Sequence, residues 1–470
     1  MNRPTIGEVE SPTTGASRAF APALVLTALS TFLSMLAYSG PLGNAPTISA
    51  ALAAGPGATM WILSSMSTGL AVSLLTAGAL ADQSGRRRVF EIGAVIFVGG
   101  SIVCATSTTA TQFIAGRLIE GLGAAGLIAT GLGLVAAVRG DLRARSLTAS
   151  WWGAAMGLGI ALGPLLTGLL DLAHLWRAAY WLLALISAGV GLAARRCFPE
   201  TAVVPGRRMD LFGATTMTIA VAGLLVALVE SRGGSSAVAV ACAVASVIAL
   251  GVFIASQLTI AAPMMDLTLF RRPDFVAATG AAAVTGIGVI ALMSFACTFL
   301  VTTLAMSTFG AGALLALWSG TSAVAAVLSR GLTVRISGTL QLVIGLAGTG
   351  IGLLLMTHLS AGSSFTRLIP GLVVAGIGGG ILNAGLGRQA IATVPPERAA
   401  VGVGMNNTTR YIGSSVGVTV VGVLASAPHH DIAAQLSGWN VVTVLTGAIS
   451  LAGAAAVLIL HRRSSGAVVG

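Results

Sequence analysis

Long apolar stretches alternate with short polar turns along the whole 470-residue chain. A helix needs roughly 20 predominantly apolar residues to cross the hydrocarbon core of a bilayer. Fourteen stretches are about long enough, and they lie near 20–42, 59–80, 89–107, 112–138, 147–170, 178–197, 211–230, 237–257, 275–304, 310–329, 339–358, 367–392, 400–426 and 440–460. The pattern therefore predicts an all-α protein that crosses a membrane fourteen times.

The composition excludes a water-soluble protein of this size. The chain is 55% hydrophobic and only 8% charged, with a mean hydropathy of +0.94. Its longest polar stretch runs from about Arg195 to Asp210, which is too short for a separate soluble domain. The first twenty residues are polar and include Glu8 and Glu10, so we expect no cleavable signal peptide.

The basic residues fix the expected orientation. The chain has a net charge of +11 and its 25 basic residues are all arginines. With fourteen spans and a cytoplasmic N-terminus, nineteen arginines fall in cytoplasmic segments, three fall outside and three lie within spans. Such a bias predicts a multi-pass protein of the cell membrane with both termini cytoplasmic. A nucleic-acid-binding protein is the rival interpretation of a basic chain, but these charges are divided among many short loops.

A polar insert separates the second and third predicted spans, and it runs from Gly78 to Arg88. The spacing of Gly78, Asp82, Gly85, Arg86 and Arg88 resembles the signature loop between helices 2 and 3 of the major facilitator superfamily. The glycines permit close approach of helix ends, and the resemblance implies a conformational gate. The alternative is a basic loop that merely orients the chain.

The resemblance also implies contacts for this insert. Asp82 is expected to reach the positive end of the helix that begins near Ala399. Arg86 and Arg88 are expected to pair with cytoplasmic acids, of which Glu91 and Asp141 are nearest in sequence.

Two further elements carry the resemblance. Phe198-Pro199-Glu200-Thr201, just after the sixth span, again resembles the superfamily, and the Asp-x-x-Gly element that begins at Asp210 resembles its fourteen-helix drug/proton antiporter branch. The implied fold is an all-α polytopic membrane protein of two six-helix bundles plus two inserted central helices. Its expected parts are an N-terminal tail (1–19), an N-terminal bundle (20–197), a linker with the inserted helices (198–274), a C-terminal bundle (275–461) and a second tail (462–470).

One ion pair is expected inside the fourth span. Arg117 and Glu120 are three residues apart and share a helix face. Their segment resembles the R-x-x-Q-G-x-G-x-A element of the family, with Glu120 where glutamine is usual, and that resemblance implies a role in proton coupling. A self-neutralising pair that only holds the helix is the structural alternative.

The fifth span carries small residues at helical spacing. Gly159, Gly163, Pro164 and Gly168 resemble the antiporter-type helix-5 motif G-x-x-x-G-P-x-x-G-G. Small residues four apart let helices pack closely, and proline permits a kink, so we expect a helix that rocks against a neighbour. Ordinary small-residue packing is the alternative in a chain with 62 glycines.

The first span departs from the antiporter branch, because Ala37 stands where the family has a membrane-embedded aspartate. The residues left to form a substrate cavity are Tyr38, Asn44, Trp318, Asn406, Asn407 and Arg410. Such a lining suits neutral or weakly polar aromatic compounds. The Glu120 carboxylate could still accept one positive charge of the cargo.

These features together predict a secondary transporter that exports hydrophobic or amphipathic small molecules, of the drug or antibiotic type, in exchange for protons. Its partners would be the small-molecule cargo, protons and the lipid bilayer, and we expect a monomer. We expect no enzyme activity, no nucleic acid, no metal and no cofactor other than the proton gradient as energy source. Two alternatives remain: a carrier of a metabolite, sugar or lipid with different coupling, and a membrane sensor or scaffold that transports nothing.

Overall fold

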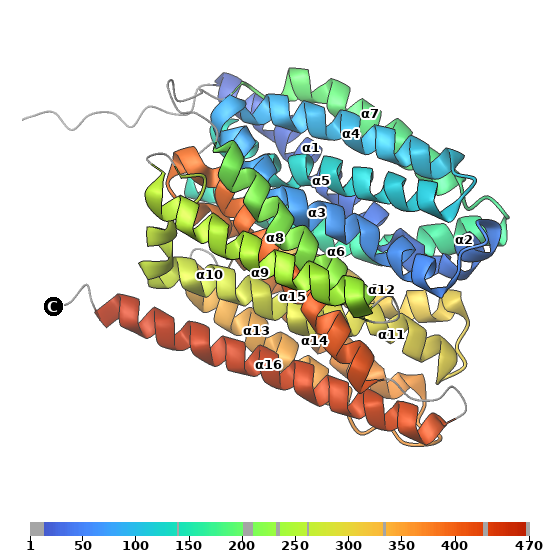
Figure 1. Ribbon diagram of the computed structural model, residues 1–470. Helices are drawn as coiled ribbons and strands as arrows, with labels where there is room; N and C mark the ends of the chain where they lie inside the picture. The colour runs from blue at the N-terminus through green and yellow to red at the C-terminus, as the bar shows by residue number, and fades with distance from the viewer. Residues whose placement is uncertain are drawn as a thin grey trace, which may run out of the picture.

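The computed structural model describes residues 14–138, 141–200, 210–231, 236–260, 263–331, 335–425 and 431–466. These residues form helices that lie roughly side by side, with short connections at the two ends of the molecule (Figure 1). A helix satisfies every backbone hydrogen bond within itself, which is the condition for crossing hydrocarbon. The all-α membrane fold expected from the sequence is confirmed.

The first half of the chain forms one helical bundle. Its long helices are α1 (Thr14–Ser39), α3 (Pro56–Ser84), α4 (Arg86–Thr106), α5 (Ala110–Val138), α6 (Leu142–Leu172) and α7 (Ala178–Cys197), and η1 (Gly40–Gly43) and α2 (Ala45–Ala51) join α1 to α3. Helix α5 is the central helix, because it packs against α1, α3 and α4.

The second half forms a second bundle. The ninth predicted span is α10 (Pro273–Val284), the π-helical turn η3 (Thr285–Ile290) and α11 (Ala291–Thr302). The others are α12 (Thr308–Leu328), α13 (Gly338–Leu355), α14 (Ile369–Ala392), α15 (Ala399–Leu424) and α16 (Ile432–Gly466), with short turns η4 (Ser329–Gly331), η5 (Phe365–Leu368) and η6 (Pro396–Arg398).

Two helices and a short turn lie between the halves in sequence. They are α8 (Leu211–Glu230), α9 (Ser236–Thr259) and η2 (Leu267–Arg271). Helices α8 and α9 pack on each other, and α8 also packs on α3 and α15. The Asp-x-x-Gly element holds this hairpin: Asp210 accepts hydrogen bonds from the Gly213 amide at 2.7 Å and from the Gln257 side chain at 2.6 Å.

Thirteen of the described helical segments are long and apolar enough to cross a membrane. The predicted span near 400–426 is the one that is not among them, although α15 is a 26-residue helix at that place. Its polar residues lower its hydropathy, and most of them are buried against other helices. A helix shielded from lipid by its neighbours tolerates such residues.

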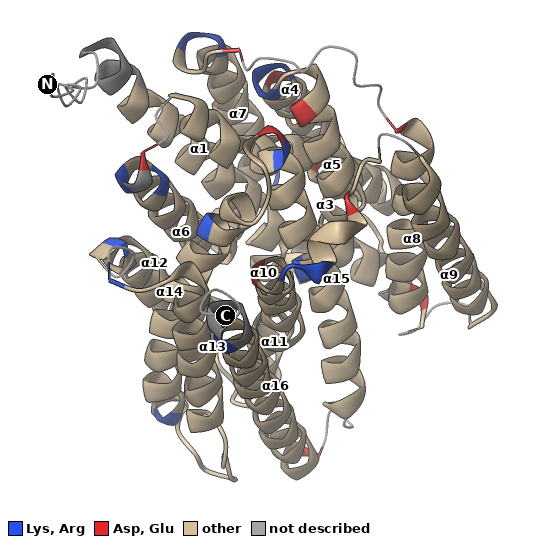
Figure 2. Ribbon diagram, turned by 90° about the vertical axis from the view of Figure 1, so that its left-hand side faces the viewer, with Lys and Arg blue, Asp and Glu red and all other residues tan. Residues whose placement is uncertain are grey.

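Arginines gather at one end of the molecule. Helix α1 begins and α16 ends at this end, which we call the terminal end, and the opposite end is the α2 end (Figure 1). Figure 2 looks at the terminal end and shows basic residues, in blue, at the starts and ends of several helices. At the α2 end the described arginines are Arg177 and Arg367.

The two bundles meet along two lines of contact. Helix α3 of the first bundle packs on α15 of the second, and α6 packs on α12 and α14. Because each line involves helices from different halves, relative movement of the bundles must occur along these two lines. They also enclose the space in which a cargo would lie.

Candidate functional site

A buried carboxylate joins the two bundles at the terminal end. Asp82 Oδ1 accepts hydrogen bonds from Arg86 Nε at 2.9 Å and Nη2 at 2.8 Å. The same carboxylate accepts the backbone N–H groups of Ala400 at 3.2 Å and Val401 at 2.9 Å. Arg86 Nη2 also donates to the carbonyl of Pro396 at 2.8 Å. We call these five residues the Asp82 contact.

The Asp82 contact acts as a helix cap supplied by another helix. The first N–H groups of a helix lack partners within it, and the N-cap residue of α15, Arg398, makes no side-chain capping hydrogen bond. Asp82 fills this role from α3, and its negative charge is favoured at the positive end of the helix dipole. The structure thus places Asp82 at the helix start where the sequence led us to expect it.

The arginines of the insert pair differently from the prediction. Arg86 binds Asp82 rather than Glu91 or Asp141, because a four-residue step across Gly85 brings the two side chains together. Arg87, which the sequence did not single out, lies 3.2 Å from Glu200 and 3.6 Å from Glu91.

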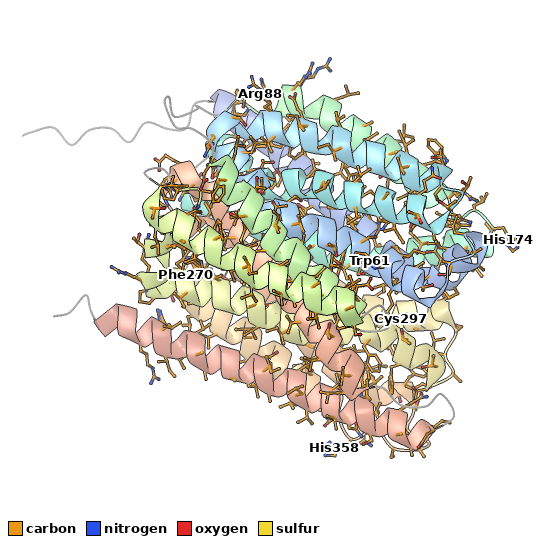
Figure 3. The ribbon with its side chains drawn as sticks, viewed as in Figure 1. Trp61, Arg88, His174, Phe270, Cys297 and His358 are labelled. Carbon is orange, nitrogen blue, oxygen red and sulfur yellow. The ribbon has the colours of Figure 1, made fainter. Side chains whose placement is uncertain are left out.

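Arg88 is exposed at the edge of the molecule (Figure 3). Among the described residues the structure shows no ion pair for it. The prediction that Arg88 pairs with a cytoplasmic acid was therefore wrong within this part of the chain. Its charge faces solvent at the terminal end.

Glycine is required at two positions of the insert. Gly78 faces α15, and a Cβ there would overlap the backbone carbonyl of Ala400. Gly85 turns the chain between α3 and α4 with φ +102°, a left-handed conformation that favours glycine. Close backbone contact continues toward the middle of α3, where a Cβ at Gly404 would lie 2.5 Å from the carbonyl oxygen of Leu74.

The helix-5 motif lies on α6, but its glycines do not face the other bundle. A Cβ at Gly159 would lie 2.6 Å from the Phe32 carbonyl oxygen, and one at Gly163 would lie 2.7 Å from that of Leu36. Both glycines therefore fix α6 against α1 within the first bundle. Gly168 has looser contact, 3.7 Å from the Gly43 carbonyl oxygen.

The opposite face of α6 meets the second bundle. A Cβ at Gly153 would lie 3.0 Å from the Ala384 amide of α14, and one at Gly157 would lie 3.2 Å from the Ser319 carbonyl of α12. The two stripes of small residues therefore occupy different faces of α6, and rocking of this helix against a neighbour stays a prediction. Pro164 lies on α6 and lines a cavity between the two bundles, which we call the central cavity.

Arg117 and Glu120 form a sealed ion pair. Arg117 Nη1 lies 2.7 Å from Glu120 Oε2, and both side chains are completely buried. Arg117 Nη1 also donates to the Ala37 carbonyl at 2.8 Å, while the Ser101 hydroxyl donates to Glu120 Oε1 at 2.8 Å. The pair thus lies between α1, α4 and α5, inside the first bundle and away from the cavity lining. The Glu120 carboxylate is therefore not accessible to a positive charge on cargo in the cavity. The expectation that it accepts such a charge was wrong.

A cavity lies between the bundles near the middle of the molecule. Its volume is about 100 Å³, and it is lined mostly by apolar side chains from both halves. A second hollow of about 600 Å³ shares Tyr38, Leu42 and Ser294 with it and extends toward the ends of α8 and α15 at the α2 end. Cys297, another lining residue of the first cavity, is labelled in Figure 3.

Three of the six predicted cavity residues line this space, namely Tyr38, Trp318 and Arg410. The other three are buried elsewhere. The Asn406 amide donates to the Ala278 carbonyl of α10 at 3.1 Å, and the Asn407 amide donates to the Val403 carbonyl of its own helix at 3.0 Å.

Asn44 follows η1 and is 1% exposed. None of the three asparagines belongs to the lining of either hollow. Their assignment to the cavity was wrong, because hydropathy alone does not show which side of a helix faces the space. The lining residues that the sequence did not single out include Met156, Met293, Ser319, Ser322 and Asn383.

Two packed bundles, a cavity between them and a polar contact across one end define a polytopic transporter. A family model of the Major Facilitator Superfamily matches residues 27–418, and the chain belongs to this superfamily. It is therefore a multi-pass membrane protein that acts as a secondary transporter of small molecules and not as an enzyme. The family expected from the sequence motifs is confirmed.

Similar curated proteins carry names of resistance and export. "Multidrug resistance protein Stp" of Mycobacterium tuberculosis is 29% identical over 384 residues, which cover 81% of this chain and 71% of that protein. "Probable actinorhodin transporter" of Streptomyces coelicolor is 30% identical, with 81% and 68% covered. "Methylenomycin A resistance protein" of Bacillus subtilis is 28% identical, with 77% and 78% covered.

A solved structure shares the fold. The crystal structure of the human organic anion transporter MFSD10 (TETRAN) aligns with a TM-score of 0.67 and covers 95% of this chain and 100% of that chain. The two sequences are 19% identical, so the likeness concerns the fold alone.

Replacing Gly78 with valine should prevent the Asp82 contact from closing, because the new side chain overlaps the Ala400 carbonyl. We expect a several-fold rise in labelling of Cys297 by a membrane-impermeant thiol reagent applied from the terminal end, in a variant whose other three cysteines are serines. Gly99→Val is the matched control, since a Cβ at Gly99 meets nothing within 4 Å. Equal labelling of the two variants would contradict this role for Gly78.

Proposed function

We propose that the chain exports hydrophobic or amphipathic small molecules of the drug or antibiotic type in exchange for protons. It would do so as a monomer in the cell membrane, with the terminal end in the cytoplasm. The observation that carries this proposal is a largely apolar cavity between two bundles that the Asp82 contact joins at the arginine-rich end. The names of the relatives in Mycobacterium, Streptomyces and Bacillus support the kind of cargo.

The orientation follows from the arginines. Short loops rich in arginine are retained on the cytoplasmic side, and the described arginines gather at the terminal end (Figure 2). The second hollow, which extends toward the α2 end, then lies on the outer side. In this arrangement the Asp82 contact closes the cytoplasmic side, and cargo leaves through the hollow.

Alternating access requires this contact to break and reform. Charge-assisted hydrogen bonds contribute about 1.5–3 kcal/mol each, and two of the four that reach Asp82 come from the opposite bundle. When the bundles separate, cytoplasmic water reaches Asp82 and the N–H groups of Ala400 and Val401. Hydration of these groups offsets part of the free energy lost with their hydrogen bonds. The outward and inward states then differ little enough for cargo and protons to shift the balance.

Transport itself provides the direct test of this proposal. Inverted membrane vesicles should accumulate aromatic dyes or antibiotics when their interior is made acidic, because protons then leave in exchange for cargo. Collapse of this gradient should abolish accumulation. Vesicles from the same host without the protein are the control. Accumulation of a sugar or other polar metabolite, with none of the aromatic compounds, would support the alternative carrier instead.

Proton coupling is assigned to Glu120, because it is an acid buried deep within a bundle beside a guanidinium that biases its protonation. Glu120→Gln mimics the protonated form and keeps an acceptor for Arg117. We predict that this variant loses gradient-driven export but retains cargo exchange across vesicles without a gradient, with unchanged membrane insertion. Full gradient-driven export by Glu120→Gln at normal abundance would remove Glu120 from the coupling mechanism.

Selection of cargo by its shape is assigned in part to Trp318. This residue is 4% exposed and lies in the cavity wall. Trp318→Ala should alter the relative export of compounds of different ring size several-fold, because it enlarges the space that holds the ring. Protein abundance is measured in parallel, since loss of a buried tryptophan costs about 3–5 kcal/mol of stability. Trp61→Ala is the control, because Trp61 lines neither hollow.

Two results would count against this cargo assignment. One is a Trp318→Ala export profile identical to the wild type at equal abundance. The other is a panel in which doubly charged cations are the best-exported compounds, since the cavity lining holds no negative charge to receive them.

A further inference from the structure

Arg410 is the one charged residue among the described residues that line the central cavity. It lies on α15, and its side chain is directed between α6 and α14, so residues of both bundles surround its head group. The residue is only 3% exposed. A guanidinium at this depth is costly unless it has a partner or serves a function.

The partners of this guanidinium are neutral. Arg410 Nη1 donates to Asn383 Oδ1 at 3.3 Å, and Nη2 contacts the sulfur of Met156 at 3.5 Å. The head group also lies 5.6 Å from the ring centre of Tyr411. Its Nε is buried without a hydrogen-bond partner. Within the described parts of the chain, no carboxylate lies within ion-pair distance of Arg410.

Two buried acids of the first bundle are engaged elsewhere and do not neutralise this charge. Glu120 is sealed in its pair with Arg117, and Asp82 is held at the start of α15. The residues lining the central cavity and the second hollow include no acid. A cationic cargo would therefore meet a like charge with no opposite charge to offset it.

The packing around Arg410 keeps its position fixed. Gly286 of the π-helical turn η3 packs so closely that a Cβ would overlap the backbone carbonyl of Arg410. A Cβ at Gly413 would lie 2.5 Å from the carbonyl oxygen of Ala283. Turns of π-helix occur frequently at functional sites, and this one places Thr285, Val289 and Ile290 in the cavity wall.

The rest of the lining suits a flat ring system. Tyr38 and Trp318 offer aromatic faces, and Met156 and Met293 offer polarizable sulfur. The second hollow, which shares Tyr38 and Ser294 with this cavity and holds about 600 Å³, has the size of a pocket for a drug-sized molecule. Hydroxyl groups of Ser319 and other serines provide neutral hydrogen-bonding positions.

We propose that the cargo class is an aromatic monoanion, whose carboxylate, phenolate or sulfonate group binds the Arg410 guanidinium while its ring lies between Tyr38 and Trp318. The planar guanidinium matches such groups and needs one to complete its hydrogen bonds. This inference deepens the proposed export function and rests on it for the direction of transport. Recognition of the anion itself depends only on the cavity.

Equilibrium dialysis of the purified full chain in lipid nanodiscs tests the inference. Three tritium-labelled probes share one ring: 2-naphthoate is anionic, 2-naphthamide is neutral and 2-naphthylmethylammonium is cationic. Because charge-assisted hydrogen bonds are the stronger ones, we expect 2-naphthoate to bind roughly tenfold more tightly than the amide, with the cation weakest. Equal binding of the three probes, or tighter binding of the cation, would overturn the inference.

Two variants test whether Arg410 is responsible for the preference for 2-naphthoate. Arg410→Gln should lower naphthoate affinity to that of the amide. Asn383→Asp keeps the shape of the side chain and supplies a carboxylate next to Arg410, so it should also remove the preference for the anion. Arg388→Gln is the matched control, since Arg388 lies on α14 outside the cavity lining. If Arg410→Gln fails to fold, Asn383→Asp decides, and an unchanged anion preference in it refutes the inference.

Failure of the export function can be distinguished from failure of the anion site, because equilibrium dialysis measures binding without a proton gradient. Preferential binding of 2-naphthoate without gradient-driven export would refute the export function and leave the anion site standing. Gradient-driven export of aromatic compounds with no anion preference in dialysis would refute the anion site alone.

Discussion

A carboxylate at the start of a helix in the opposite bundle is the interaction on which the rest of this structure depends. Helix α15 begins after a proline-rich turn and has no side-chain cap of its own. Asp82 supplies the cap from α3, and Arg86 neutralises it from the start of α4. The cap exists only when α3 and α15 lie close together, so capping of α15 is coupled to the relative position of the two bundles. The glycine at position 78 permits the approach, because any larger residue would meet the Ala400 backbone.

The same helix carries both the contact and the cavity charge. Val401, which donates to Asp82, and Arg410, which faces the cavity, are nine residues apart on α15. At 1.5 Å per residue this is roughly 13 Å along a helix, so one helix connects the contact to the cavity wall. Closely packed backbones at Gly404 and Gly413 leave little room for α15 to bend independently of its neighbours. This rigidity gives a physical route by which cargo in the cavity influences the terminal end.

Sequence alone predicted the features that depend on local spacing. Apolar length located the helices, and the three-residue step from Arg117 to Glu120 placed both side chains on one face, where they do pair. The spacing of Gly78 and Asp82 likewise indicated a close contact of α3. The neighbours of the α6 glycines could not be predicted, since helical spacing shows which glycines share a face but not which helix that face meets. Asn406 and Asn407 were misplaced for the same reason, and Glu200 was missed because its partner Arg87 is distant in sequence.

The central claim is that the Asp82 contact sets the balance between two arrangements of the bundles. Pulsed electron paramagnetic resonance tests it most directly, with spin labels at the exposed positions Arg88 and Glu397 in a chain whose native cysteines are replaced. We expect two distance populations in nanodiscs, the shorter one matching this structure, and a shift toward the longer one in Asp82→Asn. A single distance that Asp82→Asn leaves unchanged would contradict it.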